Sequence, residues 1–506
     1  MSLAPAQQAA IDDLISSTPV IRRLGDLFAA AGHELYLVGG SVRDVLLGHL
    51  VNDLDFTTSA RPGQTEKLLK QVADHVWDVG REFGTITARV SDPAAPATAD
   101  PADQPHEAEA GADRHWLIEV TTFRADAYRS DSRKPEVNFG DSIDDDLVRR
   151  DFTVNAMAIE VSDDHPTFVD PHGGLADLAA RRLMTPFAPE RSFSDDPLRM
   201  MRAARFASQL DFQPAGPVIA AMTSMADRIE IISAERVRDE LSRLLLTAQP
   251  ARGLDLLCTT GIADHVLPEL PALRLEVDEH HRHKDVYQHS LIVLQQAIEL
   301  EQARGHRPDL VNRLAALLHD VGKPSTRRFE DDGRVSFHHH DVVGAKLVRK
   351  RLKALRFSSE EVKAVSKLVE LHLRFHGYSD GLTGENAGWT DSAVRRYVRD
   401  AGDQLEHLHI LTRADCTTRN QRKATRLRRA YDDLEARIDD LFAREELNAM
   451  RPDLDGTQIM ALLDLAPGPQ VGRAYQHLLD LRIENGPLGE ERATEELRRW
   501  WEQQES

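Results

Sequence analysis

One stretch of the chain, residues 37–57 (LVGGSVRDVLLGHLVNDLDFT), constrains the fold more than any other. The apolar run at residues 36–38 predicts a strand, and Gly39 and Gly40 after it permit a tight turn in which backbone N–H groups approach a phosphate. Ser41 is expected to cap the short helix that follows. This order of strand, glycine turn and helix predicts an α/β unit with a phosphate-binding turn.

Two aspartates spaced by one residue come after that helix. Asp53 and Asp55 flank Leu54 in a second strand-like run, so both carboxylates point to one face of the strand. An Asp-x-Asp pair by itself is typical of a solvated turn. Beside a phosphate-binding turn, however, two carboxylates supply the oxygen ligands that a divalent metal and a nucleoside triphosphate need.

The length and composition bound the class of protein. A chain of 506 residues predicts about three domains. The two cysteines, Cys258 and Cys416, are too few for a disulfide framework and favour a reducing, cytoplasmic location. The first residues have neither a basic segment nor an apolar core, so we expect no secretory signal. No apolar run approaches the ~18 residues of a membrane helix.

The net charge of −20 argues against a chain covered in nonspecific nucleic-acid affinity. Two local basic segments stand out against it, residues 345–356 (AKLVRKRLKALR) and residues 419–429 (RNQRKATRLRR). Each is either a solvated helix face or a surface that follows phosphates, and the sequence leaves both readings open.

Hydrophobic periodicity divides the chain into an α/β part and a helical part. Residues 11–31 have helical periodicity, and short strand-like runs alternate with turns over residues 33–160, which predicts a mixed sheet. Residues 91–114, rich in Ala, Pro and Asp, interrupt this part and are predicted to be a disordered loop. From about residue 190 the pattern is helical. The predicted fold class is therefore α+β.

Two further motifs combine arginine with aspartate. Arg149 and Arg150 are followed by Asp151 and then by a buried-looking strand. Arginine suits a triphosphate because its planar fork binds phosphate oxygens in pairs. The alternative is that both arginines only pair with the acidic residues 144–146. Asp151 is a candidate acceptor for a ribose hydroxyl.

In the second of these motifs, Asp196 and Arg199 lie three residues apart at a helix start and so share a face. The alternative is that Asp196 only caps the helix, which its place before Pro197 would suit.

Together these motifs resemble the bacterial class II tRNA nucleotidyltransferases, the CCA-adding enzymes, and their relatives the bacterial poly(A) polymerases. The resemblance covers roughly residues 30–270 and rests on five segments in order: LVGGSVRDVLLG with DLDF, RRDFTVNAMA, DPHGGLADL, DDPLRMMRAARF and ERVRDE. It implies Mg²⁺ at the catalytic Asp53 and Asp55. It also implies a nucleotide site made of Gly40, Arg43, Arg150, Asp151, Asp196, Arg199 and Arg202.

The resemblance implies template-independent addition of CCA to the 3′ end of tRNA from CTP and ATP, with release of pyrophosphate. Asp196 and Arg199 would then select the base, because cytosine and adenine both offer an amine donor beside a ring-nitrogen acceptor. The expected partner is tRNA, through its 3′ end and acceptor arm, with no obligatory protein partner and no membrane. The alternative is a poly(A) polymerase. Residues 80–85 (GREFGT) and the loop at residues 124–137 favour CCA addition.

Glu119, in the strand-like run HWLIEV, is either a third carboxylate for the metals or a solvent-facing strand residue, and we favour the second.

A separate set of histidines and aspartates follows in the helical part. His289, the adjacent His319 and Asp320, and Asp415 can supply imidazole and carboxylate ligands to one divalent ion. This set resembles the HD phosphohydrolase superfamily, and His340 and His372 could complete a second metal position. The ion is a divalent transition metal or Mg²⁺. If active, such a domain would hydrolyse a phosphoester, such as a 2′,3′-cyclic phosphate on damaged RNA.

A rival of another class is therefore an HD metal-dependent phosphohydrolase whose front half only binds nucleotide. The expected division is a nucleotidyltransferase head at residues 1–185, a helical neck at 186–275 that recognises the base, an HD domain at 276–420 and a helical RNA-binding tail at 421–506.

Overall fold

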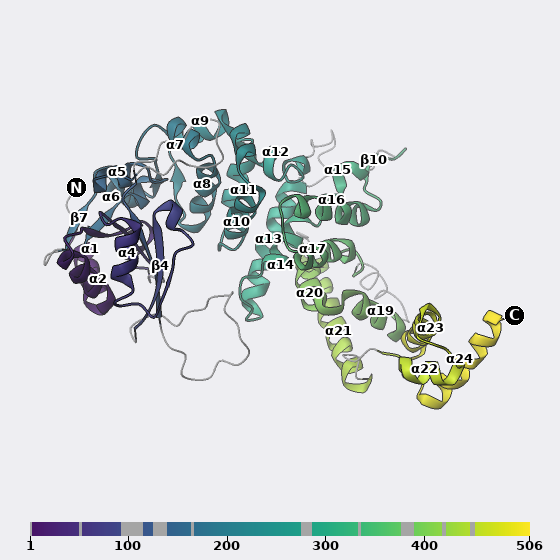
Figure 1. The fold of residues 1–506 in the computed structure, drawn as a ribbon. Helices are drawn as coiled ribbons and strands as arrows, with labels where there is room; N and C mark the ends of the chain where they lie inside the picture. The colour runs from purple at the N-terminus through teal and green to yellow at the C-terminus, as the bar shows by residue number, and fades with distance from the viewer. Residues whose placement is uncertain are drawn as a thin grey trace. The chain divides into compact units, whose positions relative to one another are not determined.

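The computed structural model describes residues 3–49, 53–92, 115–124, 139–162, 166–274, 286–331, 335–375, 389–416, 421–445 and 451–505. The chain forms two compact units, Met1–Val266 and Leu267–Ser506 (Figure 1). Most of the predicted loop at 91–114, and nearly all of the one at 124–137, lie outside the described residues.

A seven-stranded sheet forms the core of the first unit, in the order β3-β4-β5-β2-β1-β6-β7. Only β2 and β5 pair in parallel among these strands, so the sheet is mixed, as the sequence predicts. Along β5 every second side chain is buried, which is the pattern of a strand with one face on the core. The strands are β1 (Leu35–Val38), β2 (Leu54–Thr58), β3 (His75–Trp77), β4 (Thr85–Ser91), β5 (His115–Thr122), β6 (Ala158–Glu160) and β7 (Thr167–Val169).

Short helices pack on this sheet. Gly25 in α2 shows how closely, because a Cβ there would collide with the carbonyl oxygen of Val161. The helices are α1 (Pro5–Ser17), α2 (Pro19–Ala30), α3 (Gly40–Leu46), α4 (Pro62–Leu69), α5 (Ile143–Val148) and α6 (Gly174–Ala179).

The first unit ends in a helical part in which α8 is central. Gly253 of α11 allows the backbone of α11 to approach α8, since a Cβ there would collide with the carbonyl oxygen of Ala204. Arg205 of α8 pairs with the buried Glu240 of α10 at 2.8 Å. The helices are α7 (Pro189–Asp195), α8 (Leu198–Gln209), α9 (Gly216–Ser224), α10 (Ala234–Leu245), α11 (Pro250–Thr259) and α12 (Ile262–Val266).

The second unit is almost entirely helical in its described residues. Its larger part contains α13 (Val286–Ala303), α14 (Leu310–Leu318), α15 (Lys323–Thr326), α16 (His340–Ala354), α17 (Ser359–Leu371), α19 (Asp391–Ala401), α20 (Leu405–Ala414) and α21 (Gln421–Glu445). A two-stranded sheet of β10 (Arg328–Phe329) and β11 (Val335–Ser336) precedes α16.

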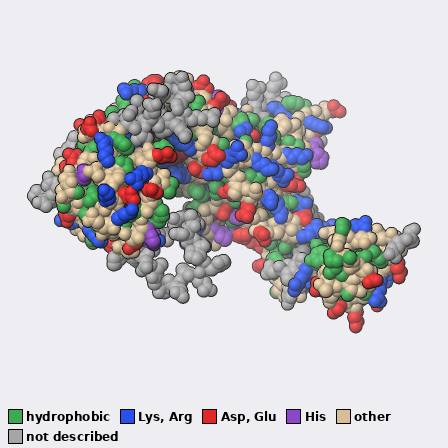
Figure 2. Space-filling model, in the orientation of Figure 1, with side chains coloured by type: hydrophobic (Ala, Val, Ile, Leu, Met, Phe, Trp, Pro, Cys, Tyr) green, Lys and Arg blue, Asp and Glu red, His purple; other side chains and the backbone are tan. Residues whose placement is uncertain are grey.

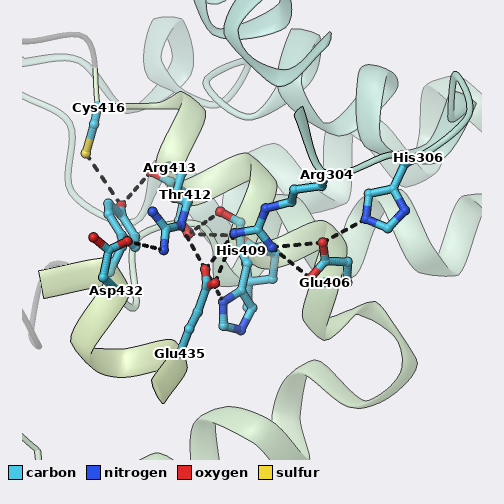
Figure 3. A network of polar contacts seen from close by, with 11 residues as sticks. Arg304, His306, Glu406, His409, Thr412, Arg413, Cys416, Asp432 and Glu435 are labelled. Atoms are coloured by element: carbon cyan, nitrogen blue, oxygen red, sulfur yellow. Dashed lines mark hydrogen bonds and ion pairs between the residues drawn. The ribbon is translucent and has the colours of Figure 1, made fainter. Parts of the chain in front are cut away.

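An ionic network holds three of these helices together (Figure 3). Arg304, directly after α13, donates to Glu406 of α20 at 2.8 Å and to Glu435 of α21 at 2.8 Å. Glu435 also accepts from Arg413 at 2.8 Å and lies 3.0 Å from Nδ1 of His409. Because charged partners surround it, the pKa of Glu435 stays well below its usual value although burial opposes this.

The chain ends in a small three-helix part: α22 (Gly456–Leu463), α23 (Pro469–Asn485) and α24 (Glu490–Glu505). Its own apolar core includes Ile459, Leu478 and Leu497. It is attached to α19, where Arg395 donates to the carbonyl oxygen of Ile483 at 3.1 Å. No helix in the described ranges of either unit is long and apolar enough to cross a membrane.

Candidate functional site

The predicted glycine turn joins β1 to α3, and it lies beside the predicted aspartates. Gly39 has φ +72°, a conformation that favours glycine. A Cβ on Gly39 would lie 2.9 Å from Nη1 of Arg150 and 4.0 Å from Oδ2 of Asp55. The absence of a side chain at this position therefore leaves room between an arginine and a carboxylate.

The prediction that Ser41 caps this helix is wrong. The helix begins at Gly40 with Gly39 as its N-cap, so Ser41 already lies in the first turn. Its hydroxyl instead donates to the carbonyl oxygen of Asp53 at 3.0 Å and accepts from the backbone N–H of Asp55 at 3.3 Å. Ser41 thus ties the glycine turn to the strand that carries both aspartates.

Three carboxylates converge at the start of β2. Asp55 pairs in register with Glu119 of the parallel strand β5, so the two side chains point to the same face. Burial and the charge of Glu119 raise the pKa of Asp55 to about 6. Burial and the charge of Asp53 likewise raise the pKa of Glu119. Glu119 keeps solvent exposure, which is the reading favoured from the sequence, yet it also lies beside the pair, as the alternative of a third carboxylate requires.

This repulsion fits a site for divalent cations. Carboxylates that share a site are costly to ionise together, and a bound cation removes that cost. Oxygen ligands of this kind are what Mg²⁺ prefers. The donor set of Asp53, Asp55 and Glu119 therefore suits the magnesium that the sequence led us to expect.

Arg43, expected to touch the triphosphate, is buried. Its Nε and Nη2 donate to the carboxylate of Asp44 at 2.8 and 2.9 Å, and its Nη1 donates to Oδ1 of Asn155 at 2.7 Å. Only 4% of Arg43 is exposed. In this conformation Arg43 ties the helix after the glycine turn to the segment after the arginine motif.

Arg149 and Arg150 both pair with Asp146, at 2.7 and 3.0 Å, which was the open alternative for these residues. Asp146 is fully buried, and burial alone would raise its pKa, but the two guanidinium groups outweigh it and lower the pKa to about 2. Each arginine remains about one fifth exposed. The pairing therefore orients Arg150 beside the glycine turn without enclosing it.

Asp151 is a buried anchor as well. Its Oδ1 accepts from the backbone N–H of Phe152 at 2.8 Å and from Asn155 at 3.0 Å, and its Oδ2 accepts from Nε of Arg202 at 2.7 Å. Arg202 also lies 3.5 Å from Glu240. Asp151 and Arg202 thereby join the sheet part to α8.

Asp196 and Arg199, the predicted base-selecting pair, have other partners than each other. Oδ1 of Asp196 accepts from the backbone N–H of Leu198, the first residue of α8, at 3.1 Å, although the N-cap residue is Pro197, and Oδ2 pairs with Arg236 at 2.8 Å. Nη1 of Arg199 donates to Oγ of Ser192 at 2.8 Å. Both side chains are therefore held in place at the start of α8.

The second unit brings all six predicted HD residues together at the ends of five helices. His289, His319 and Asp415 form one group of potential metal ligands, and Asp320, His340 and His372 form another. Asp320 links them. Its Oδ2 lies 3.2 Å from Nε2 of His319 and 3.5 Å from that of His289, while its Oδ1 lies 3.3 Å from Nε2 of His340 and 3.9 Å from that of His372.

The imidazole orientations fit metal binding. Nδ1 of His319, His340 and His372 each lies within 2.9 Å of the carbonyl oxygen three residues earlier. Donation from Nδ1–H leaves Nε2 free of a proton, as a metal ligand requires. Nε2 of His340 and of His372 is buried and forms no hydrogen bond within the described residues. Two such acceptors beside a carboxylate indicate a site for a cation.

Two residues that sequence reasoning missed support this centre. Lys323 lies 2.5 Å from Oδ2 of Asp320, and its position three residues after Asp320 was the available signal. Gly322 allows the turn after Asp320 to approach α16, because a Cβ there would collide with the carbonyl oxygen of His340.

Three family models match the chain. The Poly A polymerase head domain matches residues 35–184, the probable RNA and SrmB-binding site of polymerase A matches residues 211–273, and the HD domain matches residues 286–420.

Relatives match over much of the chain. The A-adding tRNA nucleotidyltransferase of Deinococcus radiodurans is 37% identical over 374 residues, which cover 72% of this chain and 80% of that protein. The CCA-adding enzyme of Levilactobacillus brevis is 40% identical over 233 residues, which cover 46% of this chain and 51% of that protein.

Solved structures share the fold along the whole chain. The Bacillus stearothermophilus CCA-adding enzyme in complex with CTP has a TM-score of 0.64 at 22% identity and covers 99% of both chains. The Thermotoga maritima CCA-adding enzyme complexed with tRNA has a TM-score of 0.58 at 18% identity, covering 99% of this chain and 100% of that one. These comparisons confirm both the predicted resemblance and the predicted fold class.

Proposed function

This chain belongs to the tRNA nucleotidyltransferase family, and we propose that it adds CCA to the 3′ end of tRNA from CTP and ATP with release of pyrophosphate. The observation that carries the proposal is the convergence of Asp53, Asp55 and Glu119 beside the Gly39 turn and Arg150. In such an arrangement, the reacting phosphate of a triphosphate lies between the carboxylates that bind metal and the positive charge of the arginine.

We assign each residue a task in that reaction. Asp53 and Asp55, with Glu119 beside them, would hold Mg²⁺, which when bound supplies charge neutralisation and makes the RNA 3′ hydroxyl more acidic. The turn at Gly39 and Gly40 offers backbone N–H groups to the phosphates, and the fork of Arg150 donates to phosphate oxygens. Arg43, Asp151 and Arg202 act mainly by holding these groups in place.

Asp196 and Arg199 are proposed to select the base. A carboxylate accepts from the exocyclic amine of cytosine or adenine, and a guanidinium donates to the neighbouring ring nitrogen. Uracil and guanine reverse this pattern and would leave a carbonyl against the carboxylate, which is a costly unpaired contact. The salt bridge between Asp196 and Arg236 supports this role, because it orients the carboxylate before a nucleotide binds.

The product is tested by offering CTP and ATP separately to the full-length protein. Transcripts of one tRNA would end at the position before CCA or after its two cytosines. CCA addition predicts CMP incorporation on the first transcript and AMP incorporation on the second. AMP incorporation on the second with no CMP on the first would instead identify an A-adding enzyme, as in the Deinococcus relative. Repeated AMP addition to an unrelated RNA would identify a poly(A) polymerase.

A matched pair of variants tests the metal assignment. Asp53→Asn with Asp55→Asn should abolish incorporation, while Asp144→Asn, an exposed acid in the same unit, should not. Unchanged incorporation in the double variant would refute the assignment. That result would instead favour the rival hypothesis, a phosphohydrolase whose front half only binds nucleotide.

A second activity is favoured by the buried Nε2 atoms of His340 and His372, which form no hydrogen bond within the described residues. The six HD residues would hold one or two divalent ions, of a transition metal or magnesium, with Asp320 as the shared ligand. A bound ion would supply a more acidic water and neutralise a phosphate. Hydrolysis of a phosphoester such as a 2′,3′-cyclic phosphate is therefore our second proposed function. Asp320→Asn should abolish it and leave nucleotide incorporation intact.

The remaining expectations stay proposals. We retain the division into a head at residues 1–185, a neck at 186–275, an HD domain at 276–420 and an RNA-binding tail at 421–506. The cytoplasm remains the proposed location, where tRNA and nucleoside triphosphates are present.

A further inference from the structure

One face of α16 is densely cationic in a chain of net charge −20. Residues 342–357 contain six Lys and Arg residues and no Asp or Glu. The exposed ones are Lys346, Arg349, Lys350, Lys353 and Arg356. Figure 2 shows Lys and Arg side chains gathered where α16 lies in Figure 1.

Four of these residues form one stripe along α16, and Arg356 follows just beyond the end of the helix. At 3.6 residues per turn, positions 346, 349, 350 and 353 fall within about one third of the circumference and extend for roughly 10 Å. The opposite side of α16 carries the buried Ala345, Val348 and Leu352. The stripe therefore faces away from the core of the second unit, and these four residues define what we call the α16 stripe.

The surroundings do not neutralise the three lysines of the stripe. Lys346, Lys350 and Lys353 have no ion pair within the described residues, and the bond recorded for Arg349 is a 3.4 Å contact with Ser366. A carboxylate is present nearby but is used elsewhere, since Glu269 pairs at 2.8 Å with Arg351, which lies outside the stripe.

On the neighbouring helix α17, one acid is committed to a local contact. Glu361 closes the capping box at the start of α17 by accepting from the backbone N–H of Ser358 at 2.8 Å. Lys363, exposed on the same helix, adds further positive charge. Concentrated like charge weakens a fold unless a partner relieves it, so the stripe is expected to have an anionic partner.

We propose that the α16 stripe binds the phosphate backbone of the RNA substrate. This inference rests on the proposed function, because that function supplies a long polyanion as substrate. Lysines on a helix suit backbone contacts, which need charge and no fixed geometry. A membrane fits less well, because the exposed large apolar side chain on α16 is Val342 alone among the described residues.

The test compares salt dependence of tRNA binding by the full-length protein. The variant is Lys346→Gln with Lys350→Gln and Lys353→Gln. The control is Arg22→Gln with Arg23→Gln and Lys67→Gln, which removes the same charge from exposed positions of the first unit. Binding of a fluorescent tRNA transcript lacking CCA is measured by anisotropy at several KCl concentrations.

The expected result is a loss of affinity on the order of tenfold in the α16 variant. The slope of log K against log salt should also become shallower by about 2 to 3, near one per lost phosphate contact. The control should keep the slope of the wild type. Replacing the same lysines with arginine should restore both values.

An unchanged slope in the α16 variant would overturn the proposal. So would normal RNA binding combined with a change in self-association by sedimentation, since that would assign the stripe to another protein surface. A second assay, incorporation of CMP and AMP into a short hairpin that mimics the acceptor end, distinguishes failure of the proposed function from failure of the stripe proposal. If the wild type does not extend it, the proposed function fails. If the wild type and the α16 variant extend the hairpin equally and also bind tRNA equally, only the stripe proposal fails.

Discussion

Asp55 and Glu119 face one another across the neighbouring parallel strands β2 and β5, and after burial the charge of Glu119 does most to raise the pKa of Asp55, to about 6. Carboxylates that repel in this way are expected to share a cation. The strand pairing thus adds a third acid to the two that the sequence motif provides.

Glu119→Gln should lower nucleotide incorporation and raise the Mg²⁺ concentration needed for half the maximal rate by about tenfold, as for other supporting residues of metal sites. The assay belongs at pH 8, where Asp55 is ionised with or without Glu119. Leu117→Gln, at an exposed position of the same face of β5, is the control. An unaltered Mg²⁺ dependence in Glu119→Gln would show that the residue is only solvent-facing.

Ser41→Ala should disturb the position of the aspartates rather than the binding of nucleotide. The lost hydroxyl leaves the carbonyl of Asp53 and the N–H of Asp55 without their partner, at a cost of about 1 kcal/mol each. We expect kcat to fall several-fold while KM for ATP changes little. Ser59→Ala removes a comparable hydrogen bond, to the N–H of Glu34, at the other end of β2 and should leave kcat unchanged. Equal effects of the two variants would argue against a positioning role.

Asp146→Asn should destabilise the first unit in a pH-dependent way. Pairing with Arg149 and Arg150 lowers the pKa of Asp146 from 3.8 to about 2, so its charged form stabilises the fold above pH 3.8. That contribution, about 2 kcal/mol at neutral pH, is lost as the pH falls through 2. The difference in melting temperature between wild type and variant should therefore shrink below pH 4. It should stay constant for the exposed Asp144→Asn. A full difference in melting temperature at pH 2 would show that the charge of Asp146 is not the source of its contribution to stability.

The local features of the first unit were readable from the sequence because they depend on neighbouring residues. The strand before Gly39 and the shared face of Asp53 and Asp55 need only the two-residue period of a strand. Ser41 was misplaced because the positive φ of Gly39 starts the helix two residues early, and because its hydroxyl bonds to a segment twelve residues along.

Long-range pairing explains what the sequence left open. Nothing near Glu119 indicates that β5 pairs in parallel with β2, more than sixty residues earlier. The order of the HD residues predicted their grouping, but the bridging place of Asp320 depends on how five helices meet. Lys323 carried a local signal and was missed because an acid and a lysine three residues apart are a common pattern in any sequence.

The HD residues should bind a transition metal in a pattern that separates their two positions. Ni²⁺ is a suitable probe because it prefers imidazole, whereas the carboxylates of the first unit favour Mg²⁺. His289→Ala should remove the ion held with His319 and Asp415, and His340→Ala should remove the ion held with His372. Asp320→Asn should weaken binding of both ions, because one carboxylate oxygen faces each group.

Equilibrium dialysis against Ni²⁺ measures the number of ions bound. His339→Ala, an exposed neighbour of His340, should bind as the wild type does. Incorporation of CMP with Mg²⁺ should be normal in all four variants, which reports that the first unit is intact. If Asp320→Asn kept the full Ni²⁺ content, Asp320 would not be a shared ligand, and its contact with Lys323 would be its main role.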